Sequence, residues 1–194
     1  SHISLTDCKE KEFDSLLGKG SGAGLIFGSS GGVMEAALRT AYYFETGKNS
    51  PKNFLDFEAV RGAKTKKEAS VKIGDKTLKV AAIYGLPNIE PVLQEMEKGT
   101  FTYDFIEVMN CPLGCVGGGG QVLGVIKDQE KINEARSKSL YQDDQKNKVR
   151  SSYENEDVKE IYRSYFGQPG SPLALKLLHT KFVDKSAILN GNFH

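Results

Sequence analysis

The first third of the chain predicts a strand, a glycine-rich turn and a helix. A short apolar run at 25–27, "LIF", is flanked by glycines on both sides and predicts a buried strand. After the turn "GSSGG", residues 33–44 carry apolar positions at helical spacing, namely Val33, Ala36, Ala37 and Ala41. The free N–H groups at the start of such a helix favour an electron-rich group.

The middle of the chain reads as alternating strands and one helix. Residues 54–62 are β-prone, and 69–85 alternate with period two around a Gly-Asp turn, which predicts a hairpin. Residues 86–99 predict a short helix that ends at a glycine. A second buried strand at 103–110 leads directly into Cys111. This alternation predicts an α/β fold with a mixed, partly parallel sheet flanked by helices.

The last third is expected to be helical. Residues 127–152 are polar and charged and predict one or two solvated helices. Residues 154–170 have helical spacing with a stop at Gly167, and 172–182 predict a further helix that Ser171 caps. We expect the C-terminal helices to join the sheet in a single domain over residues 1–194.

Composition excludes several classes of function. The 194 residues include 26 basic and 25 acidic ones, so no strong field attracts nucleic acid or anionic lipid. No apolar run is long enough to cross a bilayer, and no signal-peptide pattern opens the chain, so we expect a cytoplasmic protein. Three cysteines in an uneven spacing do not form a disulfide framework.

The stretch that suggests chemistry is 109–121, "MNCPLGCVGGGGQ". One reading is two small buried cysteines near a tight turn. The other is an iron–sulfur site: Pro112 and Gly114 force a turn that can point both thiols one way, and the following glycines leave a backbone without side chains. A cubane takes four thiolates and this stretch has two. Cys8 lies in a distant charged segment and is interpreted as incidental.

A second glycine-rich segment, "GKGSGAG" at 18–24, does not predict a nucleotide site. A dinucleotide fingerprint follows a strand and opens a helix, whereas this segment precedes the predicted strand and is expected to be a mobile or closely packed loop. The turn "GSSGG" at 28–32 is in the right place but lacks the phosphate-reaching lysine.

These residues resemble a known family. "FIEVMNCPLGCVGGGGQ" is similar to the last of three cluster-binding signatures of the iron-only (FeFe) hydrogenases. "GKGSGAGLIFGSSGGVMEAALRTAYY" is similar to the stretch just upstream in that family, and "ENEDVKEIYRSYFGQPGSPLALKLLHTKF" to its C-terminal helices. The resemblance extends from about Glu12 to Phe182, and it identifies the chain as the C-terminal half of the catalytic domain of the large subunit.

The resemblance implies an activity and a cofactor. The family reversibly reduces protons to dihydrogen at the H-cluster, a 4Fe–4S cubane bridged to a diiron unit. It implies that Cys111 ligates the cubane, and that Cys115 ligates it and bridges to the diiron unit. Met109 is implied to pack beside the diiron unit and Phe27 to line the pocket, and both count with Cys115 as catalytic residues. The implied pocket is completed by Gly28, Val33, Gly117, Gly118, Gly119, Gly120 and Gln121.

Two departures from the family pattern leave alternatives open. The earlier cysteine signatures, with the other two cubane ligands and a proton-relay cysteine, do not occur in these residues. We therefore expect the chain alone to be inactive and to need an N-terminal half of the same domain and a ferredoxin-like electron carrier. Asn110 and Leu113 replace residues that are usually small, which favours a hydrogen-sensing or regulatory relative as one alternative. A cluster-free α/β module is another.

Overall fold

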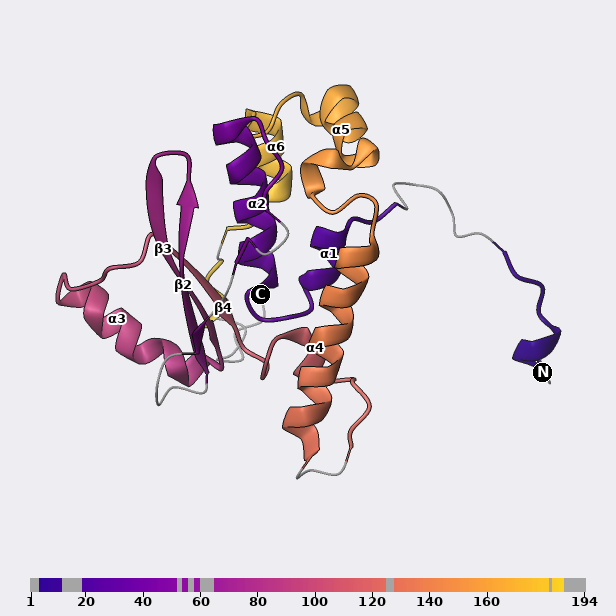
Figure 1. Ribbon diagram of the computed structural model, residues 1–194, viewed down its shortest axis with the longest axis horizontal. Coiled ribbons are helices and arrows are strands. Elements are labelled where there is room, and N and C mark those ends of the chain that lie inside the picture. The colour runs from indigo at the N-terminus through magenta and orange to yellow at the C-terminus, as the bar shows by residue number, and fades with distance from the viewer. Residues whose placement is uncertain are drawn as a thin grey trace. The chain divides into compact units, whose positions relative to one another are not determined.

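The computed structural model describes residues 4–11, 19–51, 54–55, 58–59, 65–124, 128–181 and 183–186. The chain forms two compact units, Ser1–Asn155 and Glu156–His194. The first contains the sheet and the cysteine turn, and the second contains the last helices (Figure 1). In the described part of the chain, no helix is both long and apolar enough to cross a membrane.

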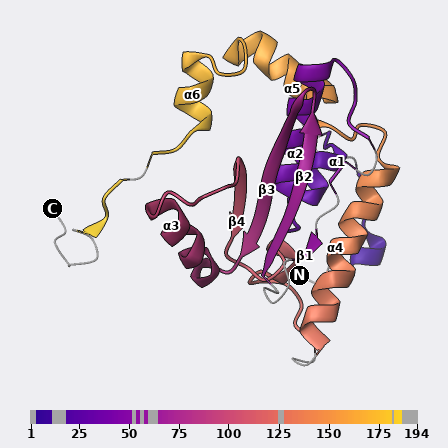
Figure 2. The same ribbon diagram turned by 60° about the vertical axis from the view of Figure 1, so that its left-hand side comes forward.

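The sheet is mixed, as the sequence predicts. Its four strands lie in the order β1 (Glu58–Ala59), β2 (Lys66–Ile73), β3 (Lys76–Tyr84) and β4 (Phe105–Met109). The first three are antiparallel and β4 runs parallel to β3 (Figure 2). The predicted hairpin is therefore confirmed, with its turn at Gly74 in the left-handed region. Most of the β-prone segment 54–62 lies outside the described residues.

The predicted amphipathic helix packs on one face of this sheet. Helix α2 (Gly32–Thr46) buries Met34 and Leu38 against alternate positions of the hairpin, namely Val71, Ile73 and Val80. Tyr42 extends this core toward Phe54, where the two rings meet edge to face with centroids 5.2 Å apart. The helix ends at Gly47, whose φ of 68° suits a glycine C-cap.

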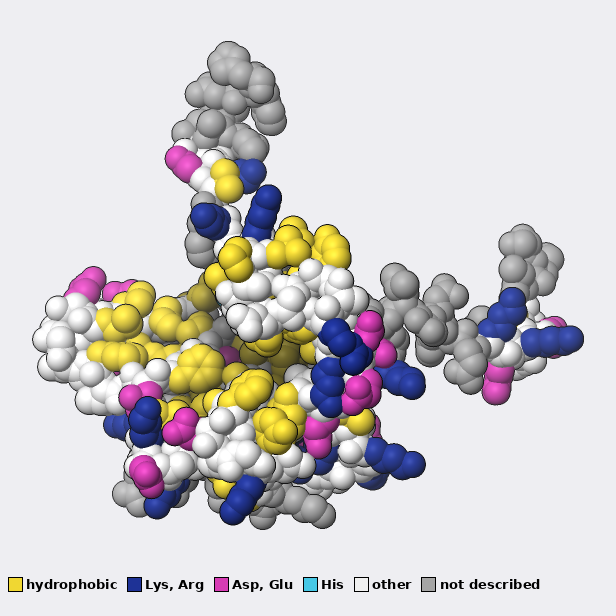
Figure 3. Space-filling view, turned by 90° about the horizontal axis from the view of Figure 1, so that it is seen from above, with side chains coloured by type: hydrophobic (Ala, Val, Ile, Leu, Met, Phe, Trp, Pro, Cys, Tyr) yellow, Lys and Arg dark blue, Asp and Glu magenta, His cyan; other side chains and the backbone are white. Residues whose placement is uncertain are grey.

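The parallel pairing of β3 and β4 needs a crossover, and the segment between them makes it. A short 3-10 turn (Leu86–Ile89) leads into α3 (Glu90–Glu97), and the helix stops before Gly99 as predicted. Figures 1 and 2 show α3 on the side of the sheet away from α2. Leu93 and Met96 of α3 are exposed. Figure 3 shows that apolar side chains are exposed on the face seen there.

The predicted strand at 25–27 is wrong, because the structure has a helix there. Helix α1 spans Gly22–Ile26, and the Ser21 hydroxyl caps it by accepting a hydrogen bond from the Gly24 N–H at 3.3 Å. It packs on α4 (Gln129–Lys146), the predicted polar helix (Figure 1). Gly22 has no room for a side chain, since an added Cβ would lie 2.1 Å from Oδ1 of Asp144. Within the expected loop, residues 22–24 are therefore helical, and Ser21, Gly22 and Ala23 are buried, whereas Gly20 is exposed.

The second unit has the predicted helices. Helix α5 (Glu156–Ile161) continues into a π-helical turn (Tyr162–Phe166) that stops at Gly167. Helix α6 (Pro172–Leu178) begins with proline in its first turn, and the Ser171 hydroxyl accepts from the Ala174 N–H at 3.1 Å. Short 3-10 turns at Leu5–Asp7, Cys115–Gly117 and Ser152–Glu154 complete the described elements.

Candidate functional site

The cysteine turn begins where β4 ends. Strand β4 runs parallel to β3, so the carboxyl ends of the two strands lie at the same edge of the sheet. The carbonyl of Met109 accepts a hydrogen bond from the Gly85 N–H at 2.7 Å, which fixes the point where the chain leaves the sheet. Cys111 follows two residues later, so the sheet determines where the turn starts.

This turn binds to the turn that precedes α2. The Ser30 N–H donates to the carbonyl of Leu113 at 2.8 Å, and the Val116 N–H donates to the carbonyl of Gly28 at 3.0 Å. Gly114 makes this approach feasible, because its φ is 99° and an added Cβ would lie 2.7 Å from the Ser30 nitrogen. The structure therefore brings Gly28 next to the cysteine turn, although more than eighty residues separate them in the sequence.

Several other predicted residues lie around this junction. The thioether sulfur of Met109 lies beside Gly114, 3.0 Å from the position of an added Cβ. Phe27 follows α1 directly, and its side chain is 45% exposed. Val33 is half-buried in the first turn of α2. Apolar and sulfur-containing side chains thus stand on both sides of the two turns.

The two thiols differ in exposure. Cys111 is half-buried and Cys115 is exposed, and both are free. Cys115 lines a cavity of about 390 Å³ together with the neighbouring Val116, with Gly28 and Gln121, and with residues of α1 and α4, namely Leu25, Arg136, Ser139 and Leu140. Cys111 lies beside Gly118, where an added Cβ would be 3.5 Å from its sulfur. A methyl group at position 118 would therefore be in van der Waals contact with this thiol, and its tighter contact, 3.1 Å, would be with the Cys115 carbonyl oxygen.

The four glycines have different surroundings. An added Cβ at Gly117 would lie 2.1 Å from the Pro112 carbonyl oxygen and 2.6 Å from Nδ2 of Asn133, so this glycine is required by the packing of the chain on itself. Gly119 and Gly120 have open space around them, and Gly120 has a φ of 89°. The implied contact of all four with a cluster stays a prediction, and Gly117 has an internal reason to lack a side chain.

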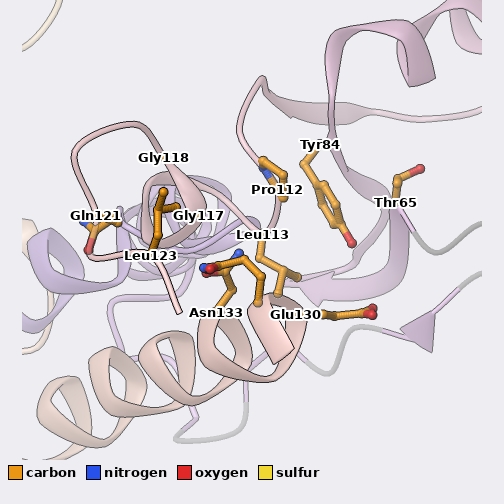
Figure 4. Close-up of a pocket in the computed structure, with 11 residues that line it drawn as sticks. Thr65, Tyr84, Pro112, Leu113, Gly117, Gly118, Gln121, Leu123, Glu130 and Asn133 are labelled. Carbon is orange, nitrogen blue, oxygen red and sulfur yellow. The ribbon is translucent and has the colours of Figure 1, made fainter. Parts of the chain in front are cut away.

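A second cavity, of about 380 Å³, lies on another side of the same loop (Figure 4). The loop contributes Leu113, Gly117, Gly118 and Gln121, and Tyr84 stands across from Glu130 of α4. Burial raises the pKa of the Tyr84 hydroxyl, and the nearby carboxylates of Glu130 and Glu134 raise it further. The phenol is therefore neutral at ordinary pH and able to donate a hydrogen bond.

The sequence led us to expect an electron-rich group at the start of α2, and the structure identifies one. The carboxylate of Glu107, a buried residue of β4, accepts hydrogen bonds from the Gly31 N–H at 2.5 Å and the Met34 N–H at 2.8 Å. A charged side chain at a buried position of the otherwise apolar strand "FIEVM" is the sequence feature that could indicate this role. The carboxylate ties β4, which leads into the cysteine turn, to the turn that precedes α2.

The two serines of the same turn are also buried. Ser29 and Ser137 share a hydrogen bond between their hydroxyl oxygens at 2.6 Å, which joins the turn to α4. The Ser30 hydroxyl is buried and has no hydrogen-bond partner among the described residues. Nothing in the sequence pattern predicted these contacts.

A buried ion-pair network joins α2, the helix that follows the Gly28–Ser30 turn, to α4. The Arg39 guanidinium binds Glu35 at 2.6 Å and both oxygens of Asp144 at 2.8 Å, and Arg150 binds Asp144 at 2.7 Å. Burial alone would raise the pKa of Asp144, but hydrogen bonds from Arg39 and Arg150 outweigh it and hold this pKa below its usual value. Burial raises the pKa of Glu35 despite the opposing effect of Arg39. Helices α2 and α4 are thereby held together.

Sequence comparison identifies the protein family to which this chain belongs. Residues 1–119 match the family described as "Iron only hydrogenase large subunit, C-terminal domain", and residues 130–185 match "Iron hydrogenase small subunit". The first match covers more than half of the chain. The chain belongs to the iron-only hydrogenase family.

Individual relatives of this hydrogenase family include enzymes and assembly factors. The chain is 39% identical over 187 residues to the NADP-reducing hydrogenase subunit of Solidesulfovibrio fructosivorans, covering 96% of this chain and 31% of that protein. It is 30% identical over 202 residues to a cytosolic Fe–S cluster assembly factor of Xenopus tropicalis, covering 97% of this chain and 39% of that protein. Family membership alone therefore does not decide between hydrogen chemistry and cluster assembly.

A solved structure agrees with the fold. The chain is similar to an [FeFe]-hydrogenase from Chlamydomonas reinhardtii, with a TM-score of 0.69 and 38% identity, covering 94% of this chain and 52% of that one. The chain thus spans about half the length of this solved hydrogenase and about a third of the curated relatives it matches. The predicted fold class and family are confirmed.

The thiols fit part of the ligand set that the family implies. A four-iron cluster takes four thiolates, and Cys111 and Cys115 present two from one turn. Among the described residues, no group of three or more histidine, cysteine, aspartate or glutamate side chains is arranged to hold a metal. The donor chemistry of the two cysteines suits an iron–sulfur cluster, and two thiols are half of the number that a four-iron cluster takes.

Proposed function

We propose that this chain forms one wall of the catalytic centre of an FeFe hydrogenase, and that the whole protein reversibly reduces protons to dihydrogen. The observation that carries the proposal is the junction of two turns. The turn with Cys111 and Cys115 is hydrogen-bonded to the Gly28–Ser30 turn, with Met109 beside it. Two soft ligands are held here against a backbone with little side-chain cover, which suits a large inorganic group.

Each residue has a definite task in this proposal. Cys111 and Cys115, as thiolates, would hold the H-cluster, and Cys115 is the more exposed of the two. Met109 and Phe27 would keep water from the reacting side, because neither carries a group that holds a proton. When bound, the cluster would supply the redox chemistry by which two protons and two electrons form dihydrogen. The chain's own part is to bind, orient and shield.

The remaining parts belong to a companion segment. We propose that an N-terminal half of the same domain contributes the other two thiolates and a proton-relay group, and that a ferredoxin-like carrier delivers the electrons. In support, the chain spans about half of the solved hydrogenase chain it resembles. Consistent with this division, only two cysteines lie at the site. On this basis the chain by itself is inactive.

The first experiment is anaerobic iron and sulfide analysis of the protein, with Cys115→Ser and Cys111→Ser as variants. We expect bound iron in the whole protein, a strong loss of it in each variant, and hydrogen evolution from a reduced dye only when both halves are present. Cys8→Ser is the matched control, since Cys8 is exposed and distant in sequence. Iron content unaffected by Cys111→Ser and Cys115→Ser would overturn the proposal.

A second candidate follows from the comparisons. Because the chain is also 30% identical to a cytosolic Fe–S cluster assembly factor, a role in cluster assembly is the alternative that a specific observation favours. The two functions predict different results when hydrogen turnover is measured on the iron-loaded protein. A protein that binds iron through both cysteines and neither evolves nor consumes hydrogen after maturation would be assigned to the assembly branch or to a sensor. Hydrogen turnover would assign it to the enzymes.

A further inference from the structure

The side chain of Arg136 tethers the four-glycine loop by hydrogen bonds at both of its ends. Arg136 of α4 donates from one terminal nitrogen to the Val116 carbonyl at 3.0 Å and from the other to the Val122 carbonyl at 2.6 Å. These two carbonyls lie on either side of the segment Gly117–Gln121. The guanidinium therefore bridges the base of the loop.

Such a tether matters because of what it restrains. Consecutive glycines have more backbone freedom than any other sequence, and an added Cβ at Gly119 or Gly120 would meet no atom within 4 Å. The Gly117 and Gly118 N–H groups donate to preceding carbonyls at 3.0 Å, but beyond Gly118 the described restraint is weak, since the Gln121 N–H reaches the Gly118 carbonyl at 3.4 Å. Closing the loop at its base removes much of this freedom without placing a side chain near the thiols.

The surroundings of Arg136 hold it in this position. The Asn133 side-chain oxygen accepts from Arg136 at 3.4 Å and from Nε2 of Gln129 at 2.9 Å, and Asn133 is buried. Gln129 in turn accepts from the Gly124 N–H at 3.2 Å. A fork with two parallel donors is specific to arginine, because lysine has a single nitrogen.

Arg136 is also one of the residues that line the cavity containing Cys115. A residue with a permanent positive charge therefore belongs to the wall of the space beside this thiol. We propose that Arg136 is a positioning residue that closes the glycine loop and presents a fixed positive charge to the group held at Cys115. The second part rests on the proposed function, whereas the first part does not require iron. Positive charge beside an iron–sulfur cluster favours its reduced form.

The experiment compares Arg136→Gln, Arg136→Lys and Lys138→Gln. Lys138 is exposed on the same helix, so its variant removes the same charge outside the cavity. In the 194-residue chain without iron, hydrogen exchange at the Gly118 and Gln121 amides should rise on the order of tenfold in Arg136→Gln and less in Arg136→Lys. Lys138→Gln and the hairpin amides should match the wild type. Unchanged loop exchange in Arg136→Gln would overturn the tether.

The charge is tested on the iron-loaded whole protein. A redox titration followed by electron paramagnetic resonance should give a lower midpoint potential in Arg136→Gln, with Arg136→Lys closer to the wild type. Equal potentials in all three proteins would overturn the role of the charge. If the wild type binds no iron, the proposed function and the charge role fail together, while the exchange result still decides the tether.

Discussion

Glu107 caps the first turn of α2, to which Met34 belongs, and it does so from β4, the strand that leads into the cysteine turn. Its carboxylate accepts from the Met34 N–H at 2.8 Å and from the preceding Gly31 N–H at 2.5 Å. A helix normally finds its N-cap in its own sequence, but Gly31 has no side chain to offer. The cap that α2 lacks locally is thus provided across the sheet.

Replacing Glu107 by alanine should destabilise the fold strongly. Two buried N–H groups would lose their acceptor, and each unsatisfied donor costs roughly 1–3 kcal/mol, so we expect a loss of about 2–5 kcal/mol. Glu107→Gln keeps one carbonyl acceptor and should lose about half of that. Urea unfolding measures both, and Glu97→Gln on the exposed face of α3 is the control. A Glu107→Ala protein as stable as this control would contradict the capping role.

Much of the fold could be predicted from periodicity. The hairpin, α2, α3 and β4 have long or regular patterns, and the structure has each of them. The failure was at 25–27, where three apolar residues are too few to distinguish a strand from a buried helix. One local and one long-range contact stabilise the helix: the Ser21 hydroxyl caps it, and Gly22 allows Asp144 to approach. The approach of Asp144 is not visible in a local pattern.

The cysteine turn could be located from the sequence, whereas the contacts that hold it in place could not, and the roles of its residues stay predictions. The resemblance pointed to Cys111 and Cys115, and the structure places them at one turn next to Gly28. Glu107 and Arg136 were missed, because each acts on backbone groups far away in the sequence. A carboxylate facing a helix start, or an arginine facing two carbonyls, becomes apparent only when the elements are packed.

Removing the charge of Asp144 should cost stability in a pH-dependent way. Asp144→Asn leaves Arg39 with a weakened partner in a buried site, and we expect a loss of about 3–5 kcal/mol at pH 7. Because Arg39 and Arg150 outweigh burial and lower the pKa of Asp144 in the folded state, its contribution is complete above the unfolded value of about 3.9. It is lost as the pH falls through the folded-state pKa. Urea unfolding should therefore show the gap to wild type shrinking below about pH 4.

Glu35 provides the internal contrast, because burial raises its pKa. Its stabilising contribution is complete below the unfolded pKa and is lost as the pH rises through the folded-state pKa. In Glu35→Gln, stability relative to the wild type should therefore increase with pH, opposite to the trend for Asp144→Asn. Parallel trends in the two variants would contradict these assignments.

At position 113 a glycine variant should be more stable than an alanine variant, which reverses their usual order of stability. The φ of Leu113 is 60°, the left-handed region, which costs a non-glycine residue on the order of 1 kcal/mol. Leu113→Ala keeps this strain and loses side-chain contacts, whereas Leu113→Gly relieves it. We expect the glycine variant to be more stable than the alanine variant by about 1 kcal/mol in thermal unfolding. Alanine more stable than glycine would mean that the backbone relaxes out of this conformation.

Within the glycine run, position 117 should tolerate no side chain and position 119 should tolerate one. An alanine Cβ at 117 would lie 2.1 Å from the Pro112 carbonyl oxygen, and relief requires the backbone of the cysteine turn to move. We expect Gly117→Ala to lose more than about 2 kcal/mol of stability, as overpacking against backbone does. Gly119→Ala meets open space and should stay within about 0.5 kcal/mol of wild type, as ordinary surface substitutions do. Urea unfolding of the iron-free chain separates the two, and if both are harmless, the turn is not packed against Pro112 as the structure has it.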